Sequence, residues 1–318
     1  MSHPATLLPP LIVIAGATGT GKTALSVLLA EQTNGEIINA DSRSFYRGMD
    51  IGTAKVEPEL RQRVPHHLID ILDPGDDMSL SLFQQMAMQA IDDVLSRGKL
   101  PFLVGGTPQY LNAVVENWKI PEVAPDESFR RNMEQRVREE GVEPILRELR
   151  AVDPASAERT GPNPRRIIRA LEVHRVTGRP MSELQGKRPP RYRTLQYECW
   201  LPRDILHQRI AHRIDLQVEQ GLFAEVGALL ESGVDPEWPV FSTIGYREVV
   251  PFLQGTITEQ EAIDAIRFAT NRLVRHQQTW ARKNPHLIRI DMNDPATPDR
   301  VLDQIRAFIA SPASGASN

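Results

Sequence analysis

A glycine-rich segment near the amino terminus constrains the fold of this chain more than any other feature. Residues 16–23 read GATGTGKT and fit the pattern G-x-x-x-x-G-K-[ST]. The apolar run at residues 11–14 precedes them directly, and an apolar helical pattern starts at Ala24. A strand, a glycine turn and a helix in this order place backbone N–H groups and the positive end of a helix dipole around one anion. The segment therefore predicts a phosphate or diphosphate site at the end of the first strand.

Within this segment two side chains have expected roles of their own. Lys22 would reach the outer phosphate, and the hydroxyl of Thr23 would ligate Mg²⁺. The alternative is a plain glycine turn before a helix, with Lys22 solvated. The residues expected to bind a diphosphate or nucleotide are Gly16, Ala17, Thr18, Gly19, Thr20, Gly21, Lys22 and Thr23.

The first third of the chain alternates short apolar runs with helical patterns, which is typical of a parallel α/β sheet. Strands are expected at residues 11–15, 36–39, 67–71 and 100–104, and a helix at 79–97. Residues 126–185 then show only helical patterns, the first helix beginning after Asp126 and running to Glu140, where Gly141 stops it. A strand at 194–201, helices at 205–230 and 258–282, and a last strand at 286–291 follow.

This order predicts an α/β fold, a P-loop NTPase-like parallel sheet with an inserted all-helical domain. The core would comprise residues 8–118 and 194–310 with helices at its carboxyl-terminal end, and the insertion residues 119–193. Residues 311–318 are expected to form a disordered tail.

Charge and cysteine content exclude several kinds of protein. A net charge of −4 predicts no indiscriminate affinity for nucleic acid, so any polyanion site must be a local basic patch. Cys199 is the only cysteine, which excludes disulfides within the chain and cysteine-based zinc sites and fits a reducing cytoplasm. The apolar start reads as a core strand rather than a signal peptide, and no window is long enough for a membrane span.

Two of the expected strands lead into an acidic residue, Asp41 after residues 36–40 and Asp70 after residues 67–69. Ligands of open α/β sheets bind at the carboxyl ends of the strands, so Asp41 should lie beside the glycine-rich segment. A carboxylate there can ligate metal, act as a general base or cap the next helix. Asp70 could instead only close a turn towards residues 73–75.

Six further segments resemble, in order, the tRNA dimethylallyltransferase family. They are DSRSFYRGMDIGTAK (41–55), PHHLID (65–70), LVGGT (103–107), RIIRALEV (166–173), IGYRE (244–248) and QQTW (277–280). The resemblance spans roughly residues 12–283 and, with one cysteine and hence no zinc finger, implies the bacterial type. In this family the glycine-rich loop holds dimethylallyl diphosphate. The prenyl group passes to N6 of the adenosine 3′-adjacent to the anticodon in tRNAs reading codons that start with U, and diphosphate is released.

The resemblance implies roles for individual residues. Asp41 would take the proton of the adenine amine, while Lys22, Thr23 and Mg²⁺ stabilise the leaving diphosphate. Arg209 and Arg213 lie one turn apart, as on the family's diphosphate-side helix, although such a face can also be merely solvated. The residues implied to contact tRNA are Asp41, Ser42, Arg43, Ser44, Thr107, Arg130, Arg165, Arg166 and Arg169. The implied partners are the anticodon stem-loop and dimethylallyl diphosphate, with a monomeric protein and no membrane.

Two basic stretches agree with an RNA partner. Residues 159–193 hold ten Arg or Lys against Glu172 and Glu183, and residues 267–283 hold five with no acid. Some positions depart from the family pattern on the RNA side, namely Ser44, Pro108, Gln109, Leu273 and His276. Three alternatives stay open: a small-molecule P-loop kinase, a prenyltransferase acting on free adenine nucleotide, and an RNA-binding protein without activity.

Overall fold

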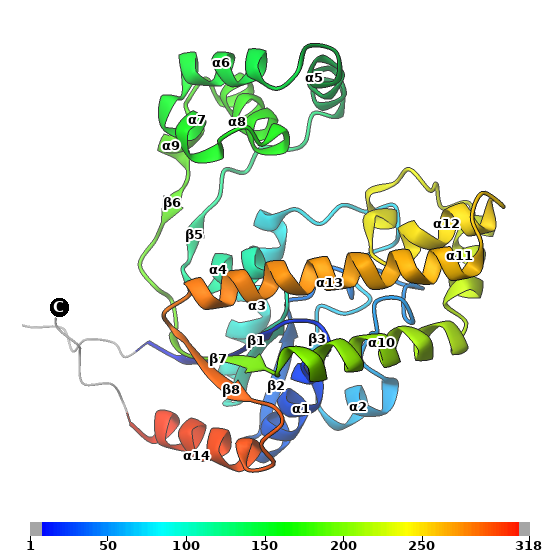
Figure 1. Ribbon diagram of the computed structural model, residues 1–318. Coiled ribbons are helices and arrows are strands. Elements are labelled where there is room, and N and C mark those ends of the chain that lie inside the picture. The colour runs from blue at the N-terminus through cyan, green and yellow to red at the C-terminus, as the bar shows by residue number, and fades with distance from the viewer. Residues whose placement is uncertain (1–7, 312–318) are drawn as a thin grey trace, which may run out of the picture. The chain divides into compact units, whose positions relative to one another are not determined.

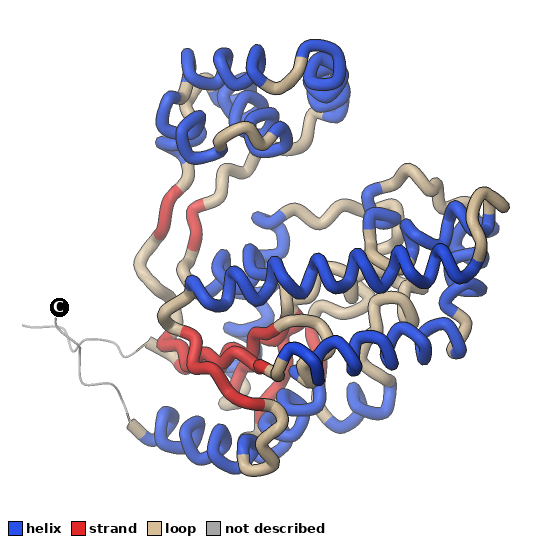
Figure 2. The backbone as a smooth tube through the Cα atoms, in the orientation of Figure 1, coloured by secondary structure: helices blue, strands red, loops and turns tan. Residues whose placement is uncertain are grey.

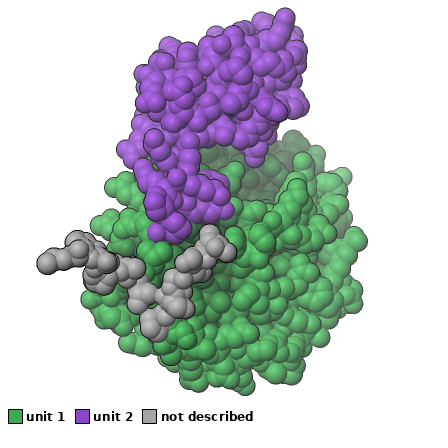
Figure 3. Space-filling view, turned by 90° about the vertical axis from the view of Figure 1, so that its left-hand side faces the viewer, with its two compact units in different colours: residues 1–115, 191–318 green, residues 116–190 purple. Residues whose placement is uncertain are grey.

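The structure is a computed structural model that describes residues 8–311 and divides into two compact units (Figure 3). The larger unit comprises residues 8–115 and 191–311, and the smaller comprises residues 116–190. The boundaries expected from the sequence, at 118/119 and 193/194, lie slightly further along the chain. Of the expected tail at 311–318, only Ser311 belongs to the described residues.

A six-stranded parallel sheet forms the centre of the larger unit (Figures 1 and 2). The spatial order is β3-β2-β4-β1-β7-β8. The strands are β1 (Pro10–Gly16), β2 (Gly35–Asn39), β3 (His66–His67), β4 (Leu100–Gly105), β7 (Arg193–Trp200) and β8 (Leu287–Asp291). The chain therefore has the α/β fold with a parallel sheet and a helical insertion that the sequence predicts.

Helices lie on both faces of this sheet (Figure 2). They are α1 (Lys22–Gln32), α2 (Pro58–Arg63), α3 (Leu80–Ser96), α4 (Pro108–Val115), α10 (Arg203–Glu219), α11 (Leu222–Glu231), α12 (Tyr246–Leu253), α13 (Glu259–Lys283) and α14 (Thr297–Ala310), with a 3₁₀ turn η1 (Pro239–Ser242). Within residues 8–311 no helix has the length and apolar content to cross a membrane.

Successive side chains of β1 pack into two separate cores, as the two-residue period of a strand requires. Leu11 and Val13 join one core with α3, α4 and the helices α10 to α13, whereas Ile12 and Ile14 join the other with α1 and α14. Because both faces are covered, β1 is apolar at every position from 11 to 15 rather than alternating.

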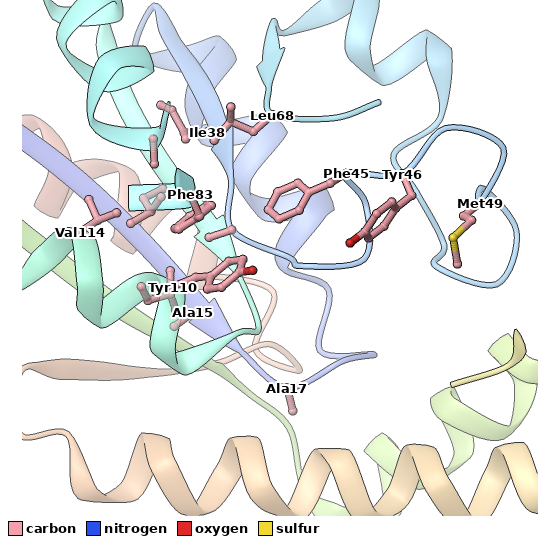
Figure 4. Packing of buried hydrophobic residues seen from close by; sticks show 14 of the residues in the cluster. Ala15, Ala17, Ile38, Phe45, Tyr46, Met49, Leu68, Phe83, Tyr110 and Val114 are labelled. Carbon is pink, nitrogen blue, oxygen red and sulfur yellow. The ribbon is translucent and has the colours of Figure 1, made fainter. Parts of the chain in front are cut away.

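An aromatic stack anchors the first of these cores (Figure 4). The rings of Phe83 and Tyr110 lie 4.1 Å apart between centroids, and Phe45 lies 5.9 Å from each of them. Phe45 belongs to the loop after β2, so this packing fixes the chain that leaves the sheet beside Asp41.

The predicted third strand is too long. β3 contains only His66 and His67, because Leu68 (φ 61°) and Asp70 (φ 56°) adopt left-handed backbone conformations that no strand accommodates. The Asn39 amide donates to the Leu68 carbonyl oxygen at 2.9 Å and holds this turn against β2.

The helix predicted at residues 205–230 is two helices. α10 ends at Glu219, and α11 begins at Leu222 after Gly221, whose φ of 99° favours glycine. The apolar period continues through the break, with Ile214 and Leu222 both buried, so periodicity alone did not reveal it. The helix predictions at 79–97 and 258–282 are confirmed by α3 and α13, which Ser79 and Thr258 cap.

The smaller unit is helical apart from a two-residue pairing of β5 (Trp118–Lys119) with β6 (Gly186–Lys187). Its helices are α5 (Glu127–Glu140), α6 (Glu143–Val152), α7 (Pro154–Thr160), α8 (Pro164–Thr177) and α9 (Met181–Leu184). Asp126 caps α5 and Gly141 follows its end, as predicted. Asp153 accepts the N–H groups of Ser156 and Ser182; burial opposes its ionisation, but these bonds lower the pKa of Asp153 to about 2. This carboxylate thereby ties α7 to α9.

Glu36 offers a test of what holds the sheet together. Its side chain is 2% exposed and accepts from Arg97, Lys99 and His67. The Arg97 hydrogen bond, with those of Lys99 and His67, holds the pKa of Glu36 well below its usual value despite burial. We expect Glu36→Gln to lower the free energy of unfolding by about 1–3 kcal/mol at pH 7, measured by urea denaturation.

The pH dependence follows from the sign of that shift. The stabilisation is complete above the unfolded pKa near 4.5 and is lost as the pH falls towards the lower folded pKa. The gap between wild type and Glu36→Gln should therefore shrink at acidic pH. Asp93→Asn, which removes a 58% exposed partner of Arg97, is the control and should cost less than about 0.5 kcal/mol. A pH-independent gap would contradict this account.

Candidate active site

The glycine-rich loop connects β1 to α1, as the sequence predicts. Gly21 occupies the N-cap of α1 with a φ of 89°, a left-handed conformation that lets the chain enter the helix without a side-chain clash. A Cβ on Gly16 would lie 2.7 Å from the Cys199 carbonyl oxygen of the neighbouring strand β7. Only glycine therefore fits where the loop leaves the sheet.

Lys22, the first residue of α1, folds back over the loop. Its Nζ donates to the carbonyl oxygen of Ala17 at 2.8 Å. Burial lowers the pKa of Lys22, the Asp41 carboxylate raises it, and the Arg213 guanidinium lowers it further. Burial also raises the pKa of the nearby Cys199 thiol to about 12, so this thiol is neutral at physiological pH. Asp41 is accordingly the counter-charge of Lys22.

Asp41 lies just beyond the carboxyl end of β2, where hydrogen bonds to neighbouring residues fix its position. Its N–H donates to Asn39 Oδ1 at 3.1 Å, and its Oδ1 accepts the N–H of Arg43 at 3.0 Å. The helix-cap alternative for Asp41 is wrong, because turns and no helix follow it. The carboxylate is thus oriented by a local turn beside two cations, Lys22 and Arg213.

Asp70 has a structural role instead. It accepts Lys55 Nζ at Oδ1 and Arg61 Nη1 at Oδ2, both at 2.6 Å. Burial opposes the ionisation of Asp70, but these two cations lower its pKa. The carboxylate is therefore engaged by the chain itself.

Gln277 of α13 joins the glycine-rich loop to the end of β4. Its Oε1 accepts the N–H of Thr18 at 3.0 Å, and its Nε2 donates to the carbonyl oxygen of Gly106 at 2.7 Å. A Cβ on Gly106 would lie 2.6 Å from this amide nitrogen. Next to Gly106, the Thr107 hydroxyl oxygen accepts the N–H of Ser42 at 3.3 Å. The ends of β1, β2 and β4 are therefore connected through side chains.

Helix α10 contributes the two expected arginines. Arg209 Nη1 lies 3.8 Å from the position that a Cβ on Gly21 would take, so Arg209 sits against the glycine-rich loop. Arg213 Nη2 donates to the Thr53 carbonyl oxygen at 3.4 Å. Burial lowers the pKa of Arg213, and the Asp41 carboxylate raises it. Arg213 is half-buried and interacts with Asp41, whereas Arg209 is exposed beside Gly21, so the solvated-face alternative is disfavoured for Arg213 and stays open for Arg209.

The other residues implied to contact RNA differ in their surroundings. In the larger unit, Arg43 donates to the Ser242 hydroxyl at 3.2 Å, whereas Ser44 is 8% exposed. Of the positions that depart from the family pattern, Pro108 begins α4, where its missing N–H costs no helical bond. Leu273 and His276 are exposed on α13, and Gln109 is exposed on α4.

In the smaller unit, four arginines fall into two pairs. Arg130 and Arg169 both bind the buried carboxylate of Glu172, and Arg169 also donates to the Val123 carbonyl oxygen at 2.9 Å. Arg165 and Arg166 are exposed in the first turn of α8. Only the second pair is displayed at the surface.

Three contributors escaped the sequence reasoning about the site. Gln277 belongs to the quoted QQTW segment, but nothing in the pattern assigns it a hydrogen-bonding role. Gln217 continues the four-residue spacing of Arg209 and Arg213, a signal that was present in the sequence. Glu225 has no such signal, because its partners are backbone groups of the loop at residues 50–52.

The sequence model of one family, IPP transferase, matches residues 44–284. The chain belongs to the IPP transferase family. Its relatives include a tRNA dimethylallyltransferase of Thermomicrobium roseum, 47% identical over 297 residues that cover 93% of this chain and 90% of the relative. A second, from Roseiflexus sp., is 47% identical over 94% of this chain and 99% of its own length.

Solved structures agree with this membership. A tRNA isopentenylpyrophosphate transferase from Bacillus halodurans is 38% identical, with a TM-score of 0.70 over 95% of this chain and 96% of that one. A eukaryotic dimethylallyltransferase acting on tRNA is 27% identical, with a TM-score of 0.79 over 95% of this chain and 80% of that one. The resemblance stated from the sequence is confirmed.

Gln277→Leu tests whether this family member needs its link between the loop and β4. The change leaves the Thr18 N–H and the Gly106 carbonyl oxygen unpaired, which costs about 1–3 kcal/mol for each buried group. We expect a lower melting temperature and at least a tenfold weaker affinity for inorganic diphosphate, measured by calorimetry. Gln278→Leu, one position along α13, is the control. Unchanged diphosphate affinity in Gln277→Leu would limit the residue to a role in stability.

Proposed function

We propose that the chain transfers a dimethylallyl group from dimethylallyl diphosphate to tRNA. The acceptor would be N6 of the adenosine 3′-adjacent to the anticodon in tRNAs reading codons that start with U, and diphosphate is released. The observation that carries this proposal is the grouping of Lys22 and Arg213 around Asp41 at the carboxyl ends of the strands. The reaction would take place in the cytoplasm, with the protein acting as a monomer.

The positively charged side chains of the site would stabilise the leaving group. Transfer breaks the allylic C–O bond, and its electron pair remains on the diphosphate oxygen. Backbone N–H groups of the glycine-rich loop other than those of Thr18 and Thr20, the Lys22 ammonium and the guanidinium groups of Arg209 and Arg213 would stabilise this growing charge. Water is replaced by fixed dipoles and charges, so little reorganisation is needed as the bond breaks.

Asp41 serves the acceptor. The exocyclic amine of adenine is a weak nucleophile, and its bond to the prenyl carbon leaves a proton on N6. The Asp41 carboxylate would accept that proton as general base. Its turn with Arg43 fixes the carboxylate, and the neighbouring residues Ser42 and Thr107 would contact the RNA around it, whereas Ser44, 8% exposed, would act by holding this segment in place.

Mg²⁺ fits the site through substrate oxygens rather than a protein cage. Among residues 8–311, no three His, Cys, Asp or Glu side chains converge as a metal site would require. The exposed Thr23 hydroxyl in the first turn of α1 would be the protein ligand, because Mg²⁺ commonly keeps waters and binds substrate phosphates. Bound there, Mg²⁺ would neutralise charge on the diphosphate.

The helical unit would bind the anticodon stem-loop. Arg165 and Arg166 are exposed at the start of α8 and would contact phosphates, whereas Arg130 and Arg169 would act mainly by fixing α8 to α5 through Glu172. On the larger unit, the exposed residues Arg272, Arg275 and Arg282 of α13 offer further phosphate contacts. Unpaired loop nucleotides can be splayed out cheaply, which gives access to the target base.

One experiment separates this function from its alternatives. The protein is incubated with labelled dimethylallyl diphosphate, Mg²⁺ and either unmodified tRNA or AMP, and ATP turnover is followed in parallel. We expect label on tRNA only. Label on AMP alone would favour the free-nucleotide prenyltransferase, and phosphate transfer from ATP without prenyl transfer would favour the kinase. Binding of tRNA without any transfer would leave the non-catalytic alternative.

Asp41→Asn tests the general base. Asparagine can still accept the Arg43 N–H, so the turn is kept while basicity is lost. We expect turnover to fall by about 10²–10⁴-fold with the affinity for tRNA nearly unchanged, while diphosphate should bind at least as tightly because the negative charge beside Lys22 and Arg213 is removed. Single-turnover transfer under saturating substrates measures this. Wild-type turnover in Asp41→Asn would exclude the role.

Replacing both Arg165 and Arg166 with Ala tests the RNA surface. Each lost phosphate contact should reduce the slope of log affinity against log salt by roughly 0.7–0.9, so the double variant should lower it by about 1–2. Filter binding of tRNA between low and high salt measures the slope. Arg306→Ala, with a 56% exposed side chain on α14 of the other unit, is the control. An unchanged slope in the double variant would remove these arginines from the interface.

A further inference from the structure

The loop at residues 50–53 is held by side chains from three helices of the larger unit. Its first contact is Glu225 of α11. Oε2 of Glu225 accepts the N–H groups of Asp50 and Ile51, both at 2.8 Å, and Oε1 accepts that of Gly52 at 3.1 Å. Three consecutive N–H groups converge on one carboxylate, an arrangement that binds anions.

Two further residues, Tyr246 and Gln217, add hydrogen bonds that hold Glu225 and the loop in place. Tyr246, the first residue of α12, donates its hydroxyl to Glu225 Oε1 at 2.5 Å. Gln217 of α10, 7% exposed, donates Nε2 to the carbonyl oxygens of Ile51 at 2.6 Å and Gly52 at 3.0 Å. The N–H and C=O groups of the same two residues are thus both fixed, so the loop cannot rotate its peptide groups.

Packing at Gly52 and an ion pair at Asp50 further fix the loop. A Cβ on Gly52 would lie 2.3 Å from the ring of Tyr246, so the loop backbone lies directly on that ring. Lys55, whose side chain is 1% exposed, donates to the Tyr46 carbonyl oxygen at 2.7 Å and pairs with Asp50 and Asp70. The loop is therefore a rigid body and not a free surface turn.

The next residue of the loop touches the candidate active site. The Thr53 carbonyl oxygen accepts Arg213 Nη2 at 3.4 Å, on the guanidinium that also faces Asp41 and Lys22. Arg209, Arg213 and Gln217 are spaced by four residues on one face of α10. Arg209 lies close to Gly21 of the glycine-rich loop, Arg213 donates to the Thr53 carbonyl oxygen, and Gln217 donates to those of Ile51 and Gly52. One face of α10 therefore connects the glycine-rich loop to the loop at residues 50–53.

We propose that Glu225, with Tyr246 and Gln217, is a positioning residue for the diphosphate site. It makes no contact with the glycine-rich loop; it fixes residues 50–52, and the Thr53 carbonyl oxygen then holds the Arg213 guanidinium in place for the leaving diphosphate. An arginine has several rotatable bonds, and a preset orientation removes their entropy cost from the binding step. This inference rests on the proposed function, since it names what sets the geometry of one of its cations.

Glu225→Gln is the main test, because glutamine keeps the size but loses the charge and presents an amide donor to N–H groups. We expect the affinity for inorganic diphosphate, measured directly by calorimetry, to fall at least tenfold. In steady-state transfer, the KM for dimethylallyl diphosphate should rise to a similar extent, while the KM for tRNA stays within about twofold. Tyr246→Phe, which removes one hydroxyl, should move both quantities in the same direction by a few-fold.

A double-mutant cycle distinguishes positioning from mere stability. If Glu225 acts through Arg213, then adding Glu225→Gln to Arg213→Ala should weaken diphosphate binding by less than twofold more. Glu36→Gln is the matched control, since it removes a buried carboxylate at the amino-terminal end of β2 and should lower the melting temperature without changing diphosphate affinity.

Two results would overturn the inference. One is diphosphate affinity that is unchanged in both Glu225→Gln and Tyr246→Phe, and the other is full additivity with Arg213→Ala. Because calorimetry with inorganic diphosphate needs no tRNA and no turnover, it decides the positioning role even if the wild-type protein fails to transfer a prenyl group. Failure of the proposed function would appear separately, in the transfer assay of the wild type.

Discussion

Two cations, Lys22 and Arg213, and one carboxylate, Asp41, lie half-buried together in a corner at the carboxyl ends of the strands, and this imbalance of charge governs the site. Burial lowers the pKa of both Lys22 and Arg213, the guanidinium lowers that of Lys22 further, and Asp41 offsets only part of this cost. An anion with two or more negative charges would neutralise the positive charge that Asp41 does not balance, and the N–H groups of the glycine-rich loop would add to its binding. The positive charge that the chain leaves unbalanced therefore favours a multiply charged anion, as the proposed diphosphate would be.

This corner exists because of strand order. β2, β4 and β1 are neighbours, with adjacent strands about 4.8 Å apart, so Asp41, Gly106 and Gly16 emerge side by side although they are far apart in the sequence. Register alone does not orient the loops that follow. Gln277 of α13 orients the glycine-rich loop and the end of β4, and Glu225 of α11 orients the loop at residues 50–52. Each does so through hydrogen bonds to backbone groups. Helices late in the chain thus set the geometry of loops early in the chain.

How much of this was predictable depends on the kind of signal. The glycine-rich loop, every strand of the sheet except β3, and the cap at Asp126 follow from local chemistry, and the sequence predicts them well. The early end of β3 was not predictable, because non-glycine residues such as Leu68 rarely adopt a positive φ and tertiary contacts impose it. The role of Glu225 was equally hidden, since its partners are N–H groups that every residue carries.

Arginine-rich sequence illustrates the same limit for the RNA surface. A count of charges treats Arg130, Arg165, Arg166 and Arg169 alike. In the structure, however, Arg130 and Arg169 form ion pairs with Glu172, whose side chain is 1% exposed. Removing that carboxylate would leave two guanidinium groups without their partner, so their first contribution is to the stability of the helical unit. A salt-dependent interface needs charges whose partners are solvent ions that RNA can displace. Exposure at the first turn of α8, rather than the number of arginines in the segment, therefore selects Arg165 and Arg166 as the pair that the proposed RNA interface would use.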